Sequence, residues 1–166
     1  MRRVLTAPYR TRRARSEDAR SIAALLVELC AGRADLAREA AAAALRRGTR
    51  GHEAWIATWR QMPVAVVALA PAALPGARVG YVEWLAVDAA HRRHGLGAAM
   101  LRVAKRRAQI AGWRQLHVCT FHTNRAALAL YIDCGFHPAA TLCDYVAPGV
   151  HYVQLVWPVS DKEGEP

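Results

Sequence analysis

The segment HRRHGLG, residues 91–97, places two arginines and two glycines at the start of a helical apolar pattern. Gly95 and Gly97 would let an anion approach the backbone, and the first turn of a helix offers unpaired N–H groups and a partial positive charge. Arg92 and Arg93 add two full charges. These residue types at this spacing predict a loop that binds a phosphate group.

Two common phosphate-binding motifs do not fit this segment. A Walker loop would continue with Gly-Lys-Ser or Gly-Lys-Thr, and the dinucleotide fingerprint would have its third glycine where Met100 stands. ATP and NAD are therefore disfavoured as ligands. A tight turn at Gly95 and Gly97 is the simpler alternative for the segment taken alone.

The elements that must position this loop follow from periodicity and turn signals. Residues 79–87 predict a strand before the loop, and residues 95–111 predict a helix after it, with Leu96, Met100 and Val103 on its inner stripe. The complete expected order is β, α, α, β, β, β, α, β, α, β, β. Its other elements are a strand at 10–14, a helix capped by Ser16 with Ile22, Leu25, Leu26 and Leu29 inside, a helix at 35–47 ending near Gly48, strands at 54–59 and 64–69 joined by a turn at 60–63, a strand at 115–121, a helix at 124–134, and strands at 139–146 and 150–156.

The loop and more distant residues form a recognisable pattern: the strand end WLAVD at 84–88, Arg92-x-x-Gly95-x-Gly97, Asn124, and Tyr131-x-x-x-Gly135-Phe136. Together with the order of elements, they resemble the GNAT superfamily of N-acetyltransferases over residues 9–157. The resemblance implies an α/β (α+β) acyl-CoA N-acyltransferase fold, with a central mixed, mostly antiparallel sheet, splayed central strands and flanking helices.

The resemblance implies acetyl-CoA as co-substrate. Its pantetheine arm would run beside a bulged strand, whose backbone N–H could stabilise the oxyanion of the reacting thioester. Asn124 would bond the pantetheine, Gly135 would end its helix, and Phe136 would belong to the core. The pyrophosphate would bind the loop Arg92, Arg93, His94, Gly95, Leu96 and Gly97, and the pantetheine would lie beside Leu85, Ala86 and Val87.

Two departures from relatives are visible. Ala89 stands where many relatives carry proline, which loosens the turn without removing a ligand. Residues 117–121 lack the glutamate that some protein-acetylating relatives place before the asparagine, which argues against those relatives.

Amine acetylation requires a base and an acid. Glu83 is the first candidate base, because regular strand alternation puts it on the face of Leu85 and Val87, and burial would raise its pKa. An arginine partner or a bulge that exposes the carboxylate is the alternative. His117, His122 and water are the other candidates for the base.

Tyr131 is the candidate acid for the departing CoA thiolate. A phenol of ordinary pKa near 10 keeps its proton at pH 7, and Tyr131 matches the general acid of the family. Asn124 and Tyr131 are seven residues apart on one helix face, so both could reach one extended ligand. A purely structural Tyr131 and an Asn124 that only caps its helix are the alternatives.

The acceptor amine is left open by the sequence. The family binds it at regions that correspond here to 30–35 and 144–150, where Asp35 and Asp144 could attract a cation. An antibiotic, a polyamine, an amino acid and a protein amine all remain candidates. Aromatic residues that could line this pocket or the core are Trp55, Trp59, Trp84 and Tyr145.

Charge and composition limit the rival classes. The 166 residues carry a formal net charge of +10, which suits an anionic ligand, but no nucleic-acid motif is present and the basic residues are dispersed. We therefore expect no nucleic-acid partner. A non-catalytic acyl-CoA sensor would need the loop but not Glu83 or Tyr131, and it is the main alternative to an enzyme.

Cellular context is predicted from what the sequence contains. The four cysteines show neither a disulfide framework nor a zinc pattern, so buried reduced thiols and no metal are expected. No apolar run is long enough to span a membrane, and we predict a cytoplasmic protein, with a homodimer left open. The arginine-rich start resembles a transit peptide in composition, which is the minor alternative. We expect one domain at 1–159 and a polar tail at 160–166.

Overall fold

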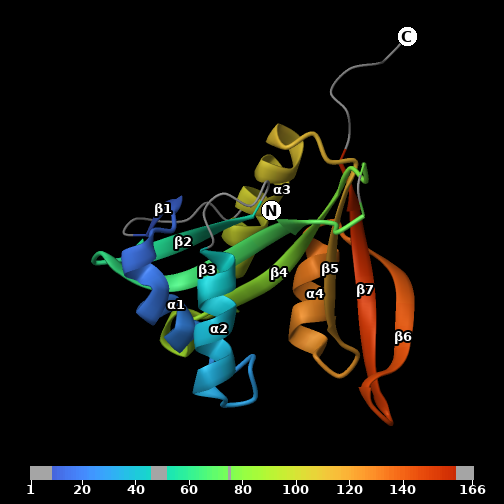
Figure 1. Cartoon of the computed structure of the whole chain (residues 1–166), viewed down its shortest axis with the longest axis horizontal. Coiled ribbons are helices and arrows are strands. Elements are labelled where there is room, and N and C mark those ends of the chain that lie inside the picture. The colour runs from blue at the N-terminus through green and yellow to red at the C-terminus, as the bar shows by residue number, and fades with distance from the viewer. Residues whose placement is uncertain (1–8, 46–51, 75, 160–166) are drawn as a thin grey trace. The chain divides into compact units, whose positions relative to one another are not determined.

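The computed structural model describes residues 9–45, 52–74 and 76–159 (Figure 1). Within these residues the predicted order of elements is confirmed, with seven strands, four α-helices and two short 3₁₀ turns, η1 and η2. The elements are β1 Arg10–Arg13, η1 Ser16–Asp18, α1 Ala19–Leu26, α2 Ala34–Ala44, β2 Glu53–Trp59, β3 Met62–Pro71, β4 Val79–Val87, η2 Ala89–His91, α3 Leu96–Ile110, β5 Gln115–Phe121, α4 Arg125–Asp133, β6 His137–Ala147 and β7 Val150–Pro158.

The described strands form a mixed sheet in the hydrogen-bonded order β1-β2-β3-β4-β5-β7-β6. The chain divides into two compact units, and β4 and α3 each contribute residues to both. Unit 1 is Met1–Ala70 with Glu83–Ala104, and unit 2 is Pro71–Val82 with Lys105–Pro166. The single domain at 1–159 stays a prediction, and the tail at 160–166 lies outside the described residues.

Unit 1 is built on an antiparallel ladder of β1, β2 and β3. Cross-strand partners include Arg13 with Trp55 and Trp59 with Met62. The predicted four-residue turn at 60–63 is wrong, because Arg60 and Gln61 both have positive φ (48° and 69°) and close a two-residue hairpin. The helices α1 and α2 pack on this sheet through a core that includes Ile22, Leu26, Ala37, Ile56 and Val66.

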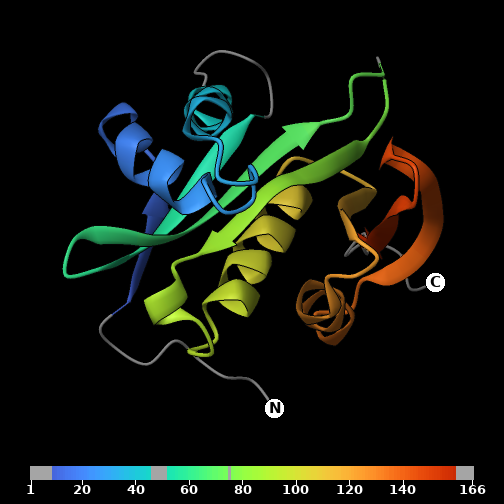
Figure 2. The same cartoon turned by 90° about the horizontal axis from the view of Figure 1, so that it is seen from below.

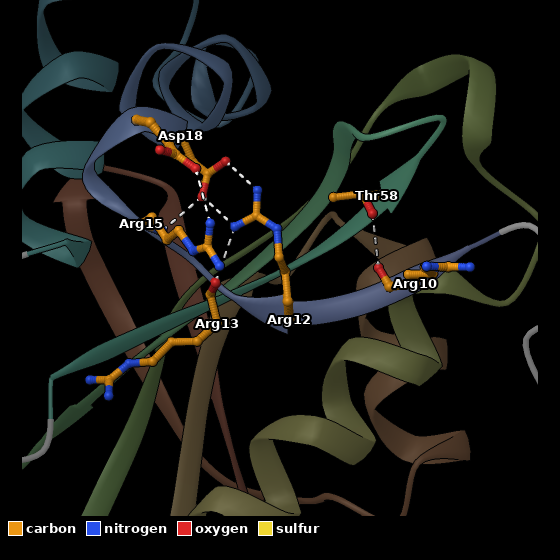
Figure 3. Close-up of polar contacts among 7 residues, drawn as sticks. Arg10, Arg12, Arg13, Arg15, Asp18 and Thr58 are labelled. Carbon is orange, nitrogen blue, oxygen red and sulfur yellow. Dashed lines mark hydrogen bonds and ion pairs between the residues drawn. The ribbon is translucent and has the colours of Figure 1, made fainter.

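The start of α1 differs from the prediction. Ser16 does not cap the helix. It opens η1, and the Asp18 carboxylate accepts a hydrogen bond from the Arg15 backbone N–H at 2.7 Å. The same carboxylate accepts two bonds of 2.7 Å from the Arg12 guanidinium, so one buried acid joins β1 to η1 (Figure 3).

The ends of the first two helices also differ from expectation. Because α1 ends at Leu26, Leu29 lies in the following turn and is 45% exposed, and Cys30 is buried there instead. The second helix begins at Ala34 and ends at Ala44, and its predicted end near Gly48 falls outside the described residues.

Unit 2 is built on β5, β7 and β6, coloured orange to red in Figure 2. These strands are antiparallel, whereas Val79–Val82 of β4 pairs in parallel with Gln115–Val118 of β5. The parallel pairing covers those four residues, and both strands continue beyond it, as expected for splayed strands. Gly80 is required in this ladder, because a Cβ there would come within 1.9 Å of the Trp113 ring. The fold class predicted from the sequence is therefore confirmed.

Candidate functional site

The predicted phosphate loop connects the end of β4 to α3 in unit 1. Arg93 and Gly95 have positive φ (65° and 80°), which turns the backbone into the start of the helix. The Ala99 N–H donates to Gly95 O at 3.0 Å and is the first amide of α3 with an acceptor in the preceding turn. Among the described residues, the amides of Leu96, Gly97 and Ala98 therefore lack such an acceptor, which is the arrangement that binds an anion.

The two arginines of the loop have different environments. The Arg92 Nε donates to Val87 O at 3.1 Å, and its guanidinium forms an ion pair with Glu28, so Arg92 ties the loop to the end of β4. Arg93 is exposed, and its side chain has no hydrogen bond or ion pair with another described residue. His94 Nδ1 bonds to Arg92 O at 2.8 Å. Arg93 is therefore the arginine whose charge is open to a ligand.

Aromatic contacts fix the turn before the loop. The Tyr9 hydroxyl lies 3.0 Å from His91 Nδ1, and the Trp59 and His91 ring centres are 5.2 Å apart. Asp88 caps η2 by accepting from the Ala90 N–H at 2.9 Å. With Ala89 in place of the proline of many relatives, this cap and these ring contacts still order the turn.

The strand segment predicted to lie beside pantetheine has Ala86 buried, with Leu85 and Val87 half-buried. The Asp88 N–H donates to Val64 O at 2.9 Å and holds the strand end within unit 1. The bulge expected at these residues stays a prediction.

Glu83 corrects the expectation of a buried base. Its side chain is exposed, because the buried residues of β4 (Gly80, Val82 and Ala86) all lie on one face of the strand and Glu83 lies on the other. The expectation that burial tunes this carboxylate is therefore wrong, and the bulge named in the alternative is not shown. A role as base at Glu83 stays a prediction that rests on its position alone.

Tyr131 lies in unit 2 on α4 and is only 6% exposed. Burial raises the pKa of Tyr131 to about 12, and the Cys119 thiol makes a smaller contribution in the same direction. Its hydroxyl has no hydrogen-bond partner among the described residues. The phenol therefore keeps its proton at physiological pH and is free to donate it to a ligand.

The end of α4 confirms the roles predicted for Gly135 and Phe136. Gly135 has φ of 78°, and its N–H donates to Ile132 O at 2.7 Å while the Phe136 N–H donates to Tyr131 O at 3.0 Å. These two bonds form a Schellman motif. Phe136 is fully buried, and Lys105 donates to Cys134 O with its ammonium 5.3 Å from the Phe136 ring centre.

Asn124 caps α4, which agrees with the interpretation of this residue as a helix cap. Its Oδ1 accepts from the Ala127 N–H at 3.1 Å, so this oxygen is already engaged. Asn124 is exposed, and its side-chain amide N–H groups are what it could offer a ligand. The bond to pantetheine stays a prediction.

The alternative bases, His117 and His122, are both in unit 2. His117 Nε2 lies 2.8 Å from Gln115 Oε1, and His117 Nδ1 lies 2.7 Å from Gln154 Nε2, so both ring nitrogens are occupied. Burial also lowers the pKa of His117, which keeps the ring neutral. His122 Nδ1 donates to His151 O at 3.1 Å. Both histidines thus have structural partners.

The carboxylates expected at the acceptor regions also have partners. Asp35 forms a bidentate pair with Arg33 at 3.2 and 2.5 Å, and this pair lowers the pKa of Asp35. Asp144 accepts from the Gly149 N–H at 2.7 Å and lies 3.8 Å from His151 Nδ1. Asp144 is exposed and belongs to unit 2, whereas Asp35 belongs to unit 1.

The four aromatic residues named from the sequence have different surroundings. Trp84 packs against the core of unit 1, Trp55 donates to Glu53 Oε2 at 3.2 Å, and Trp59 lies under the Arg60 guanidinium at 4.4 Å. Tyr145 is 64% exposed and contacts Tyr152.

All four cysteines are free thiols, but the expectation that they are buried is confirmed for Cys30 alone, and Cys134 is half-buried. Cys30 is buried, whereas Cys119 and Cys143 are exposed because they face outward from strands of unit 2. Among the described residues, no cluster of three or more His, Cys, Asp or Glu could hold a metal ion. None of the helices in the described ranges is long and apolar enough to cross a bilayer.

Comparison with known families identifies the family of this chain. The family model described as the Acetyltransferase (GNAT) family matches residues 19–136, which include the phosphate loop, Asn124 and Tyr131. The chain belongs to this family. GNAT membership implies acyl transfer from acetyl-CoA and does not name the acceptor amine.

Similarity to individual curated proteins covers about half of the chain. N-acetyltransferase family 8 member 3 of Rattus norvegicus is 34% identical over 84 residues, which are 49% of this chain and 37% of the rat protein. The mouse protein of the same name is 37% identical over the same shares of both chains. The chain thus spans little more than a third of the length of these curated relatives.

A solved structure supports the GNAT fold. A GNAT-family protein from Desulfovibrio desulfuricans matches with a TM-score of 0.81 at 21% identity, covering 92% of this chain and 99% of the other. At this identity the likeness concerns the fold.

Several residues near these sites were not singled out from the sequence. Glu28 pairs with Arg92 across 64 positions of the chain, and Tyr9 contacts His91 across 82, separations at which sequence carries no local signal. Cys119 was considered only as a buried thiol, although strict alternation along β5 places it opposite the buried Val118 and Thr120.

Proposed function

We propose that this protein is an acetyl-CoA-dependent N-acetyltransferase that transfers the acetyl group directly to a primary amine in a ternary complex. The observation that carries the proposal is the loop before α3, where three helix-start amides follow a positive-φ glycine beside an exposed arginine. The family match, which spans this loop and α4, supports it.

Unit 1 is proposed to bind the pyrophosphate. The amides of Leu96, Gly97 and Ala98 would donate to its oxygens, and Arg93 would supply a full charge. Arg92 would act mainly by holding the loop through Val87 O and Glu28. The backbone N–H groups of residues 85–87 would bond the pantetheine and the oxyanion.

The amine must lose a proton before it attacks the thioester carbonyl. Glu83 is exposed, and both ring nitrogens of His117 are occupied, so water is proposed as the immediate proton acceptor, with Glu83 as its partner. The amine nitrogen then bonds to the acetyl carbon while the carbon–sulfur bond breaks.

Unit 2 is proposed to supply the proton for the CoA sulfur. The Tyr131 hydroxyl is protonated and without a partner among the described residues, so it can donate a hydrogen bond to the thiolate as it forms. With a pKa of about 12, Tyr131 would regain any transferred proton at once from water.

The binding experiment tests the loop directly. In calorimetry, the wild-type protein is expected to bind acetyl-CoA, and Gly95→Val is expected to weaken binding at least about tenfold, because valine is strained at φ of 80° and crowds the amides. Gly112→Val is the matched control, since Gly112 also has positive φ (68°) but lies beyond the opposite end of α3.

Equal loss of affinity in both glycine variants would contradict the assignment of the loop, and no binding by the wild type would overturn the proposed function. Release of the CoA thiol on addition of amines separates an enzyme from an acyl-CoA sensor, because a sensor binds without release.

A further inference from the structure

One face of the unit 2 sheet is open. Along β5 the residues alternate strictly: Leu116, Val118 and Thr120 are buried, while Cys119 and Phe121 on the opposite face are exposed. A strand with one buried face and one open face normally carries polar residues on the open side. Here that side carries Gln115 and His117 in the first half of β5 and then Cys119 and Phe121, so its apolar part lies at the end of the strand.

Three aromatic rings gather on this face at the end of β5. Phe121 pairs in register with Tyr152 of β7, and their ring centres are 4.6 Å apart at 88°. Tyr145 of β6 lies 5.3 Å from the Tyr152 ring at 36°. Phe121 is 39% exposed and Tyr145 is 64% exposed. We call Phe121, Tyr145 and Tyr152 the aromatic patch. An exposed, connected patch of this kind marks a binding surface.

The aromatic patch and the proposed proton donor, Tyr131, share the neighbouring residue Cys119. Burial raises the pKa of Tyr152, and the Cys119 thiol adds to the effect, as it also does for Tyr131. Cys119 is paired in register with Gln154 of β7, two residues from Tyr152 along that strand. Cys119 is also two residues from Phe121 on the same face of β5. The patch and Tyr131 thus border one region of unit 2.

The charges around the patch exclude some ligands and favour others. The chain holds 23 Lys and Arg residues, yet β5, β6 and β7 contain none, and Asp144 is their one acidic residue. A cationic amine would therefore meet aromatic faces and one exposed carboxylate, which already has His151 Nδ1 at 3.8 Å, with no Lys or Arg on these strands. A polyamine, which needs several carboxylates, and an anionic acceptor both lack partners there.

We propose that the aromatic patch binds the acceptor, and that the acceptor is a small cationic amine whose amino group is attached to an aromatic or bulky apolar group. The inference rests on the proposed function, since it names the substrate class of that reaction. The apolar part would pack edge to face against Phe121 and Tyr152, and Asp144 would attract the ammonium group before it loses its proton.

The test compares two amines with the full-length protein, 2-phenylethylamine and the diamine putrescine, by CoA release at saturating acetyl-CoA. We expect kcat/KM for 2-phenylethylamine to exceed that for putrescine by about tenfold or more. In Phe121→Ala and Tyr145→Ala, kcat/KM for 2-phenylethylamine should fall about tenfold while the KM for acetyl-CoA is unchanged. Tyr145→Phe, which keeps the ring, should keep kcat/KM for 2-phenylethylamine close to the wild-type value.

Ile132→Ala is the matched control, because Ile132 is an exposed apolar residue of the same unit on α4, away from the patch residues in the chain. Ile132→Ala should leave kcat/KM for both amines unchanged. Equal use of the two amines, or equal losses in the patch and control variants, would overturn the inference while the proposed function stands. Absence of acetyl-CoA binding would overturn both.

Discussion

At the scale of single residues, environment decides which ionisable groups can do chemistry. Tyr131 is buried in unit 2, which raises its pKa to about 12, whereas the Glu83 side chain on β4 is exposed. His117 titrates in a convenient range in free solution, but burial lowers its pKa and two side chains occupy its ring. Of these three, Tyr131 alone has an environment matched to its proposed role.

Replacing Tyr131 by phenylalanine should lower kcat about a hundredfold, as expected for the loss of a general acid, with little change in affinity for acetyl-CoA. Because its pKa is raised to about 12, the wild-type rate should show no falling limb from this group below about pH 11. Steady-state kinetics from pH 6 to pH 10.5 measure both effects. A falling limb near pH 9 to 10 that vanishes in Tyr131→Phe would contradict the raised pKa.

At the scale of elements, short connections depend on single polar groups. The junction of β1 with η1 is held by the Asp18 carboxylate, whose side chain is 6% exposed and which accepts from Arg12 and from the Arg15 backbone. The end of α4 is closed by Gly135 and capped by Lys105. In each case the local sequence allows several conformations, and the polar contact selects one.

Asp18→Asn should lower the free energy of unfolding by about 2 kcal/mol, because it leaves the Arg12 guanidinium without its buried partner. Asp35→Asn is the matched control: it breaks an exposed pair and should change the free energy of unfolding much less than Asp18→Asn does. Denaturant unfolding at pH 7 measures both, and equal effects would contradict the role of Asp18.

The same junction predicts a pH dependence. Hydrogen bonds from Arg12 hold the pKa of Asp18 below its ordinary value near 3.8. The stabilisation is therefore complete above that ordinary value and is lost as the pH falls through the lower folded-state pKa. The difference in stability between wild type and Asp18→Asn should shrink as the pH is lowered from 5 towards 2.

At the scale of the whole molecule, charge is distributed unevenly. The chain has a net charge of +10, yet β5, β6 and β7 carry no Lys or Arg, so the positive charge is concentrated outside these strands. Acetyl-CoA is an anion, and a cationic protein accelerates its diffusional encounter. The amine acceptor would instead meet strands β5, β6 and β7, which hold no Lys or Arg.

Salt should therefore affect the two substrates differently. Raising NaCl from about 20 mM to about 300 mM should lower kcat/KM for acetyl-CoA about threefold or more by screening, with kcat nearly constant. The KM for 2-phenylethylamine should rise little or fall, because its binding is mainly apolar. Initial-rate measurements at several ionic strengths check this, and a salt-independent kcat/KM for acetyl-CoA would count against electrostatic attraction.

The local elements of this protein were determined by its sequence to within a few residues. The limits of β4 and β5 were predicted correctly, because alternating apolar residues bounded by turn formers define a strand without reference to the rest of the chain. The glycine spacing of the loop and the Schellman end of α4 at Gly135 were also predictable, since both depend on backbone freedom at one position.

Only the tertiary structure decided how exposed each side chain is and which partner it has. Glu83 was expected to be buried, but the buried face of β4 carries Gly80, Val82 and Ala86, and which face is covered depends on the neighbouring elements. Glu28 meets Arg92, and Phe121 meets Tyr152, across long separations in the chain. Desolvation and electrostatic contacts arise from these non-local neighbours, so a proton donor such as Tyr131 acquires its chemical character only in the folded chain.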